Sequence, residues 1–140
     1  MGMFDTYVPC DKLKNIITRE TGIKDFDWQT KSLECSLLNI DINEDLSVTL
    51  NGKSYLDSNF SMIDDPYIYN GKLLLEFEYS KLKSLLFIRP KYPNVTVQIP
   101  DTLLEFDRKG NVTATSIYDF DTVTPALLKR NYLIKLHSIS

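Results

Sequence analysis

The residues best placed for acid–base chemistry are two glutamates, Glu76 and Glu78. In an extended strand this spacing puts both carboxylates on one face. There they could meet Glu105 or Asp107 from a neighbouring strand, and paired carboxylates act as general acid and base in hydrolases. The polar face of a half-buried sheet carries the same residue types. A hydrolase-like enzyme using Glu76 and Glu78 is therefore the third of three functions that the sequence suggests.

Other catalytic and metal-binding patterns are missing from the sequence. The one histidine, His137, is a single conventional base near the end of the chain, and with Cys10 and Cys35 it offers no metal-ligand spacing. The five glycines stand apart and form no phosphate-binding loop. We predict no catalytic residue, no metal and no cofactor. Reduced thiols are expected at both cysteines, with a single bridge as the alternative.

One acidic segment resembles part of a calcium loop. Asp41, Asn43 and Asp45 have the spacing that opens an EF-hand, in which alternate oxygens converge on the ion. The match ends there. An EF-hand needs a glycine at its sharp turn and a glutamate as bidentate ligand, but this chain has Leu46 and Gly52 at those positions. The segment is expected to be a solvated turn.

A mixture of basic and aromatic residues could hold single-stranded nucleic acid by charge and stacking. No RNP-type glycine–aromatic signature accompanies it, and a net charge of −3 argues against general polyanion binding. A single-stranded nucleic-acid-binding module is the alternative function. Its candidate residues are Lys81, Lys83, Phe87, Arg89, Lys91 and Tyr92.

The elements that must position these residues centre on a hairpin between Lys72 and Arg89. A period of two over 72–79 predicts a strand with one buried face, and the apolar run 85–88 is typical of a strand covered on both faces. The expected buried set is Leu73, Leu75, Phe77 and Tyr79, with Leu74, Glu76 and Glu78 on the opposite face.

The first half of the chain predicts a helix followed by strands. Asp11 can cap a helix from Lys12 to Thr21, and Gly22 is a natural stop. The segment 27–42 predicts one strand, and Asn51-Gly52 predicts a tight hairpin turn between 47–50 and 53–56. On the strand, Leu33, Cys35 and Leu37 would share a face.

The second half predicts a meander and a closing helix. Residues 57–66 are expected to be a loop, after which 67–69 and the Asn70-Gly71 turn lead into the central strand. Strands are expected at 95–99, 103–106 and 112–118, the last two joined by a turn that contains Gly110. Thr124 and Pro125 open the expected closing helix, with a final strand over 131–136 as the alternative. Its apolar residues are Leu128, Tyr132, Leu136 and Ile139.

These elements predict a single α+β domain over residues 1–140. It is mostly an antiparallel β meander, with a short N-terminal helix and a C-terminal helix. The composition of 43% hydrophobic and 25% charged residues is that of a soluble domain with a real core. No apolar run approaches the roughly 18 residues of a membrane span, and the N-terminus has no secretory pattern. A cytoplasmic protein with no membrane partner is expected.

Two short patterns carry a resemblance. The opening Met1-Gly-Met-Phe-Asp5 and the stretch Trp28-Gln-Thr-Lys31, followed by Leu33 and Cys35, resemble small uncharacterised proteins of bacteriophages and prophages. These open MGMFD and carry an aromatic-Gln-Thr-Lys-x-Leu-x-Cys motif. The resemblance covers the first third of the chain and makes Trp28, Gln29 and Lys31 interaction candidates. Alternatively, Trp28, Leu33 and Leu37 are core residues, with Gln29 and Lys31 on the wet face of a strand.

The resemblance implies a function as well. Phage genomes carry many small early proteins that bind host or defence proteins. Together with the lack of catalytic groups, this predicts a non-enzymatic phage accessory protein that binds a host or phage protein in the host cytosol. Inhibition of a host or defence factor is one form that such binding takes.

Overall fold

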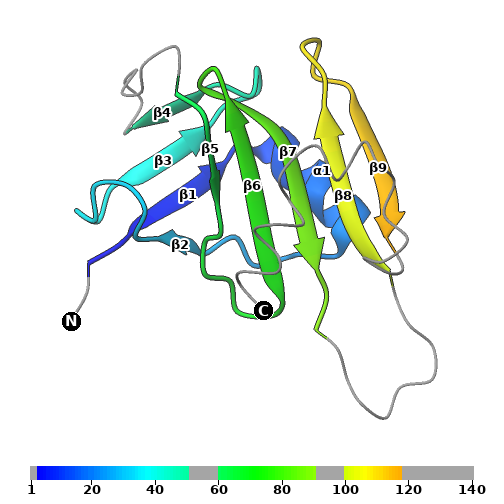
Figure 1. Cartoon of the computed structure of the whole chain (residues 1–140), viewed down its shortest axis with the longest axis horizontal. Helices are drawn as coiled ribbons and strands as arrows, with labels where there is room; N and C mark the ends of the chain where they lie inside the picture. The colour runs from blue at the N-terminus through cyan, green and yellow to red at the C-terminus, as the bar shows by residue number, and fades with distance from the viewer. Residues whose placement is uncertain (1–2, 51–59, 91–99, 118–140) are drawn as a thin grey trace.

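The computed structural model describes residues 3–50, 60–90 and 100–117, which form one helix and nine strands (Figure 1). The strands form two sheets, in the orders β2-β1-β3-β4 and β5-β6-β7-β8-β9. All neighbouring pairs are antiparallel except β1 and β3. The elements are β1 (Asp5–Pro9), α1 (Asp11–Thr21), β2 (Trp28–Thr30), β3 (Asn39–Ile42), β4 (Val48–Leu50), β5 (Met62–Asp64), β6 (Lys72–Glu78), β7 (Lys81–Ile88), β8 (Asp101–Phe106) and β9 (Val112–Ile117).

This architecture confirms the expected α+β class, mostly antiparallel strands with a short helix near the N-terminus. The five-stranded sheet runs in chain order, as a meander does. The expected closing helix from Thr124, the strand at 95–99 and the hairpin partner at 53–56 lie outside the described residues.

Helix α1 ends as predicted but begins differently. Gly22 adopts the left-handed conformation at φ 82°, and its N–H donates to the Thr18 carbonyl at 2.9 Å. The expected cap at Asp11 is wrong, because Asp11 is already helical. The N-cap is Cys10, which is extended and makes no side-chain capping bond. Leu13 and Ile17 bury the inner face of the helix.

The central hairpin is confirmed as β6 and β7, in which the buried Leu75 lies opposite the buried Leu85. One of its side chains is not where the alternation put it. Tyr79 is 63% exposed, because it forms the two-residue turn with Ser80, where both residues have positive φ. Leu74 shares a face with Glu76 and Glu78, as expected, but it is fully buried.

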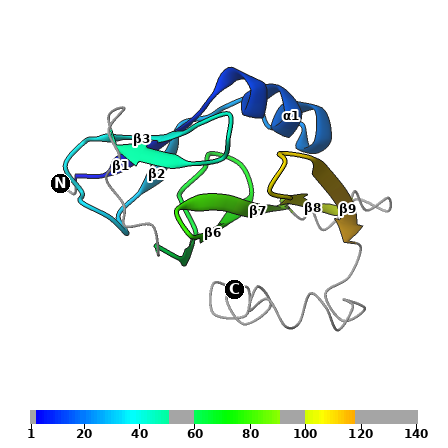
Figure 2. The same cartoon turned by 90° about the horizontal axis from the view of Figure 1, so that it is seen from above.

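The two sheets pack face to face, and ring stacking and isolated backbone bridges connect the two parts of the chain. The Tyr7 ring of β1 stacks on Phe77 of β6 with centroids 5.6 Å apart. An isolated bridge joins Ser47 to Lys81, and another joins Gln29 to Tyr67. Figure 2 shows the four-stranded sheet and α1 on the same side of the five-stranded sheet. The main hydrophobic core lies between these layers.

The loop expected at 57–66 is partly wrong. Met62–Asp64 forms β5, the edge strand beside β6, and Ile63 lies opposite Glu76. A strand of three residues is too short to show an alternating pattern, and the turn-forming residues around it therefore led to the prediction of a loop.

Gly71 and Gly110 both have positive φ, but only Gly71 is crowded. A Cβ at Gly71 would lie 2.6 Å from the Ile88 carbonyl oxygen and 2.8 Å from Phe87 Cε1, whereas one at Gly110 meets nothing within 4 Å. We expect Gly110→Ala to cost about 1 kcal/mol, the left-handed penalty alone, and Gly71→Ala to cost clearly more. Urea unfolding of the two variants checks this, and equal losses would contradict it.

Candidate functional site: a surface loop held by two buried carboxylates

The single strand expected over 27–42 is wrong, because the chain leaves the sheet after Thr30 and returns at Asn39. The residues between form what we call the 31–38 loop. Within it Cys35 and Leu37 have positive φ, at 54° and 58°, so neither continues an extended strand. Leu33 is half-buried and packs against the core, as the strand pattern suggested, but Leu37 does not.

Asp5 of β1 holds the second half of this loop. Its carboxylate is fully buried and accepts backbone N–H bonds from Cys35 at 2.8 Å, Ser36 at 3.0 Å and Leu38 at 3.1 Å. Burial raises the pKa of Asp5, but these N–H donors outweigh it and leave the pKa below its ordinary value. The Leu37 N–H also donates a hydrogen bond, to the Phe4 carbonyl at 2.9 Å. The loop backbone is therefore fixed by a charged group that stays charged.

Asp64 of β5 holds the start of the loop from the other sheet. It is 1% exposed and accepts three hydroxyl bonds, from Tyr7 at 2.5 Å, Thr30 at 2.7 Å and Ser32 at 2.8 Å. Burial raises the pKa of Tyr7, and the charge of Asp64 raises it further, so the phenol remains a donor. The Ser32 N–H donates to Thr30 Oγ1 at 3.1 Å. Because Asp64 lies inside the protein, its role is structural.

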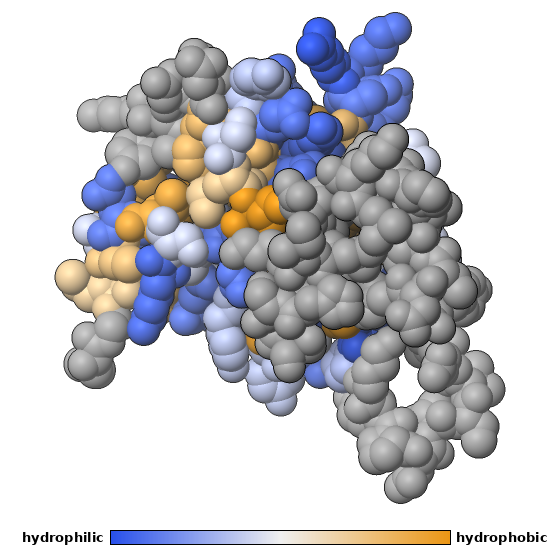
Figure 3. All heavy atoms as spheres, in the orientation of Figure 1, coloured by the Kyte–Doolittle hydropathy of each residue, from blue (hydrophilic) through white to orange (hydrophobic). Residues whose placement is uncertain are grey.

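The loop presents an apolar side chain to solvent. Leu37 is 63% exposed and Met3, one residue before the Phe4 carbonyl that binds the loop, is 55% exposed. Figure 3 shows hydrophobic patches at the left of the view, near the start of β1, and a further patch at the upper centre. Non-glycine residues in the left-handed region cost about 1 kcal/mol or more each, and such strain is concentrated at functional sites. A strained, clamped loop with an exposed leucine is the arrangement expected of a binding loop.

The three interaction candidates differ in their exposure to solvent. Trp28 is fully buried and packs against Phe26 with ring centroids 5.3 Å apart, so it is a core residue and cannot contact a partner. Gln29 is half-buried, and its backbone exchanges both hydrogen bonds with Tyr67. Lys31 is exposed at the start of the loop. The motif thus adjoins the 31–38 loop, but its most prominent side chain faces inward.

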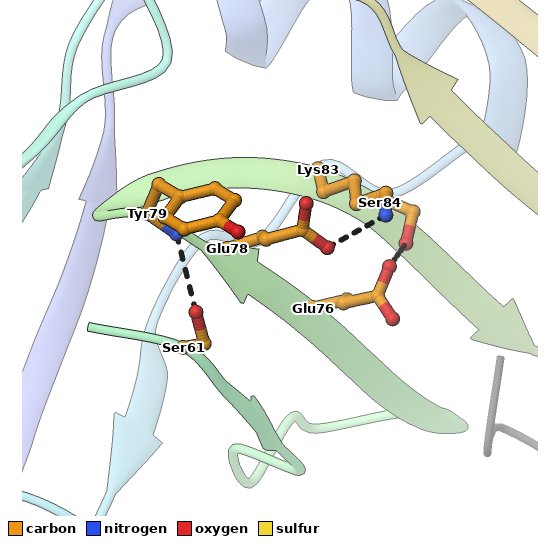
Figure 4. A network of polar contacts seen from close by, with 6 residues as sticks. All are labelled: Ser61, Glu76, Glu78, Tyr79, Lys83 and Ser84. Carbon is orange, nitrogen blue, oxygen red and sulfur yellow. Dashed lines mark hydrogen bonds and ion pairs between the residues drawn. The ribbon is translucent and has the colours of Figure 1, made fainter. Parts of the chain in front are cut away.

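Glu76 and Glu78 are on one strand face, as expected, but each is engaged by a polar side chain of β7 (Figure 4). Lys83 Nζ lies 2.7 Å from Glu78 Oε2, and the Ser84 hydroxyl donates to Glu76 Oε1 at 3.1 Å. The register shift between Glu76 and Phe77 leaves Lys83 as the extra residue of β7, free to reach Glu78.

The register and the β8–β9 turn place Glu105 and Asp107, the two carboxylates expected to meet Glu76 and Glu78. In the register Ser84 lies between Glu76 and Glu105, one strand from each. Asp107 belongs to the β8–β9 turn, where it accepts the N–H groups of Lys109 and Asn111.

The four nucleic-acid candidates that the structure describes do not form one surface. Phe87 is 6% exposed beneath the Arg89 guanidinium, which lies 5.2 Å from its ring, so it cannot stack on a base. Lys81 is at the opposite end of β7, roughly 25 Å from Arg89 for an extended strand, and Lys83 is in the ion pair with Glu78. The remaining two candidates, Lys91 and Tyr92, lie outside the described residues.

The calcium-like segment is the β3–β4 turn. Asn43 Nδ2 donates to the Ser47 carbonyl at 3.1 Å, and Asp45 Oδ1 accepts the Ser47 N–H at 3.0 Å. The side chains of Asn43 and Asp45 thus close a turn, as expected. Among the described residues no group of three or more histidines, cysteines or carboxylates could hold a metal, and Cys10 and Cys35 are free thiols.

The fold and the loop together define a two-sheet α+β protein with a preformed surface loop. Comparison with protein-family models, with curated proteins and with solved structures finds no match to this chain. In the part of the chain that the structure describes, no helix has both the length and the apolar character needed to cross a membrane.

Proposed function

We propose that this is a non-enzymatic phage accessory protein that binds a host or phage protein through the 31–38 loop. The observation that supports this best is Leu37, a large apolar side chain 63% exposed on a backbone that is held in a left-handed conformation. Hydrogen bonds from this residue and its neighbours to Phe4 and Asp5 fix the loop before any partner arrives.

A loop that is already ordered in the free protein favours binding of a partner. A flexible loop loses about 0.5–1.5 kcal/mol for each side chain that a partner immobilises, and a loop already ordered avoids part of that cost. Lys31 is exposed at the start of the loop and Met3 is exposed beside Phe4, whose carbonyl binds the loop, so they add a charged and an apolar side chain. The phage origin is supported by the opening Met1–Asp5 and by the motif that starts at Trp28. An inhibitor of a host or defence factor is the form of partner binding that we favour.

The test is affinity capture with the full-length protein and two matched variants. Leu37 and Tyr79 are both 63% exposed and both have positive φ, at 58° and 52°. Asparagine tolerates that conformation, so Leu37→Asn and Tyr79→Asn each remove a large exposed side chain without a new backbone strain. Baits are incubated with lysates of infected and uninfected cells, each with and without nuclease treatment, and bound proteins are quantified by mass spectrometry.

We expect a protein that the wild type and Tyr79→Asn retain and that Leu37→Asn loses by about ten-fold or more, since burying a leucine contributes about 1.5–3 kcal/mol. Thermal melts should show both variants folded. Equal retention by all three baits would contradict the loop as the interface. Capture that is seen in untreated lysates and disappears with nuclease treatment would favour the alternative function, binding of nucleic acid.

A further inference from the structure

A second group of buried leucines lies on the face of the five-stranded sheet turned away from α1. Leu74 of β6, Leu86 of β7 and Leu103 of β8 are directly opposite one another in the register, so they form one row on one face. Their exposed fractions are 0%, 2% and 1%. None belongs to the main core cluster between the sheets. We call this surface the outer face.

Nothing among the described elements covers the outer face. The four-stranded sheet and α1 both lie on the other side, as Figure 2 shows. Three leucines in water would leave a large apolar surface unburied, at a cost of about 1.5–3 kcal/mol for each side chain. Their burial therefore requires an occupant outside the described ranges.

The chain itself leads onto this face. Ile117, the last residue of β9, is two residues from Thr115, which pairs with Leu103, so its side chain points to the outer face. Ile117 is 9% exposed there. Residues 118–140 follow directly, and 23 residues are ample to cross a five-stranded sheet whose strands are about 4.8 Å apart.

The sequence of that segment is complementary to the outer face. Its apolar residues at helical spacing match the leucine row. From Pro125 to the end it has basic residues and no acidic one. Beside the leucines the outer face carries a carboxylate-rich strip of Glu76, Glu78 and Glu105. The apolar residues at helical spacing are Leu128, Tyr132, Leu136 and Ile139, and the basic residues are Lys129, Arg130 and Lys135.

We propose that the outer face is the docking site for the chain's own residues 118–140, with the apolar side chains on the leucine row and the basic ones toward the carboxylates. This goes beyond the proposed function and uses a different surface from the 31–38 loop.

The test is zero-length carbodiimide crosslinking of the intact, full-length protein, which joins an amine only to a carboxylate in contact with it. Unlabelled and ¹⁵N-labelled chains are mixed in equal amounts before the reaction, and the linked peptides are identified by mass spectrometry. The Glu78–Lys83 pair, 2.7 Å apart, is the internal control for the reaction.

We expect Lys129 or Lys135 to be linked to Glu76, Glu78 or Glu105, with both linked peptides carrying the same isotope. Linked peptides of mixed isotope would overturn the proposal and make a second copy the occupant. The proposal is also overturned if the control link forms while the two tail lysines are linked elsewhere or nowhere.

Discussion

Leu75→Ala and Phe77→Ala are each expected to lower the free energy of unfolding by about 2–5 kcal/mol, a large part of the 5–15 kcal/mol that holds a domain of this size together. Leu75 is fully buried and Phe77 is 2% exposed. Phe77 also contacts the Tyr7 ring of the other sheet and the Phe60 ring, at centroid distances of 5.6 and 6.2 Å. Truncation removes contacts that join the two sheets, and the surroundings can fill the cavity only in part. Thermal and urea unfolding measure the loss.

The same strand supplies the control. Glu76→Gln and Glu78→Gln alter the opposite face and should change stability by well under about 1 kcal/mol. The Glu78–Lys83 pair is half-exposed, with side-chain exposures of 42% and 38%, and such pairs contribute little. If the glutamine variants melted far below the alanine variants, the assignment of the two faces would be wrong and the acid–base hypothesis would regain support.

Asp5→Ala is expected to destabilise the protein by several kcal/mol. It would leave the N–H groups of Cys35, Ser36 and Leu38 without their acceptor, and each unsatisfied N–H costs about 1–3 kcal/mol when it stays away from water. Asp11→Ala is the matched control, an exposed aspartate in the first turn of α1, where a carboxylate contributes less than about 1 kcal/mol. Urea unfolding at pH 7 should separate the two variants clearly, and equal losses would contradict the role of Asp5.

The same carboxylate predicts a dependence on pH. The pKa of Asp5 is lower in the folded protein than its ordinary value of 3.8, so the folded state favours the ionised form. Its contribution to stability is therefore fully present above about pH 4–5 and is lost as the pH falls through the lower folded pKa. In Asp5→Asn that contribution is absent. The difference in unfolding free energy between wild type and Asp5→Asn should shrink from pH 6 to pH 3; a constant difference would contradict the prediction.

Sequence patterns that span only a few residues were enough to predict part of the fold. The alternation in β6, the left-handed stop at Gly22 and the turn at Gly110 are local signals, and the structure confirms each. Tyr79 was misplaced because a tyrosine seldom occupies a positive-φ turn position, so the strand pattern was extended one residue too far.

The candidate site could not be predicted in the same way, because its determinants are far apart in the chain. Asp5 binds N–H groups 30 to 33 residues away, and Asp64 binds a serine 32 residues away. Neither contact produces a periodic pattern of residue types in the sequence. The segment around Cys35 has strand-forming residues, yet the tertiary hydrogen bonds to Asp5 override that preference. Only the short motif at Trp28 pointed to the region, and Trp28 itself is core.

The proposed binding role depends on Asp5 fixing the 31–38 loop in the free protein. Amide hydrogen exchange, followed by NMR in the absence of any partner, measures this directly. We predict that the N–H groups of Cys35, Ser36 and Leu38 exchange far more slowly than expected for a surface loop, and that Asp5→Asn speeds their exchange while the β6 and β7 amides remain protected. Exchange of these amides at the rate of an unstructured peptide in the wild-type protein would contradict a preformed binding loop.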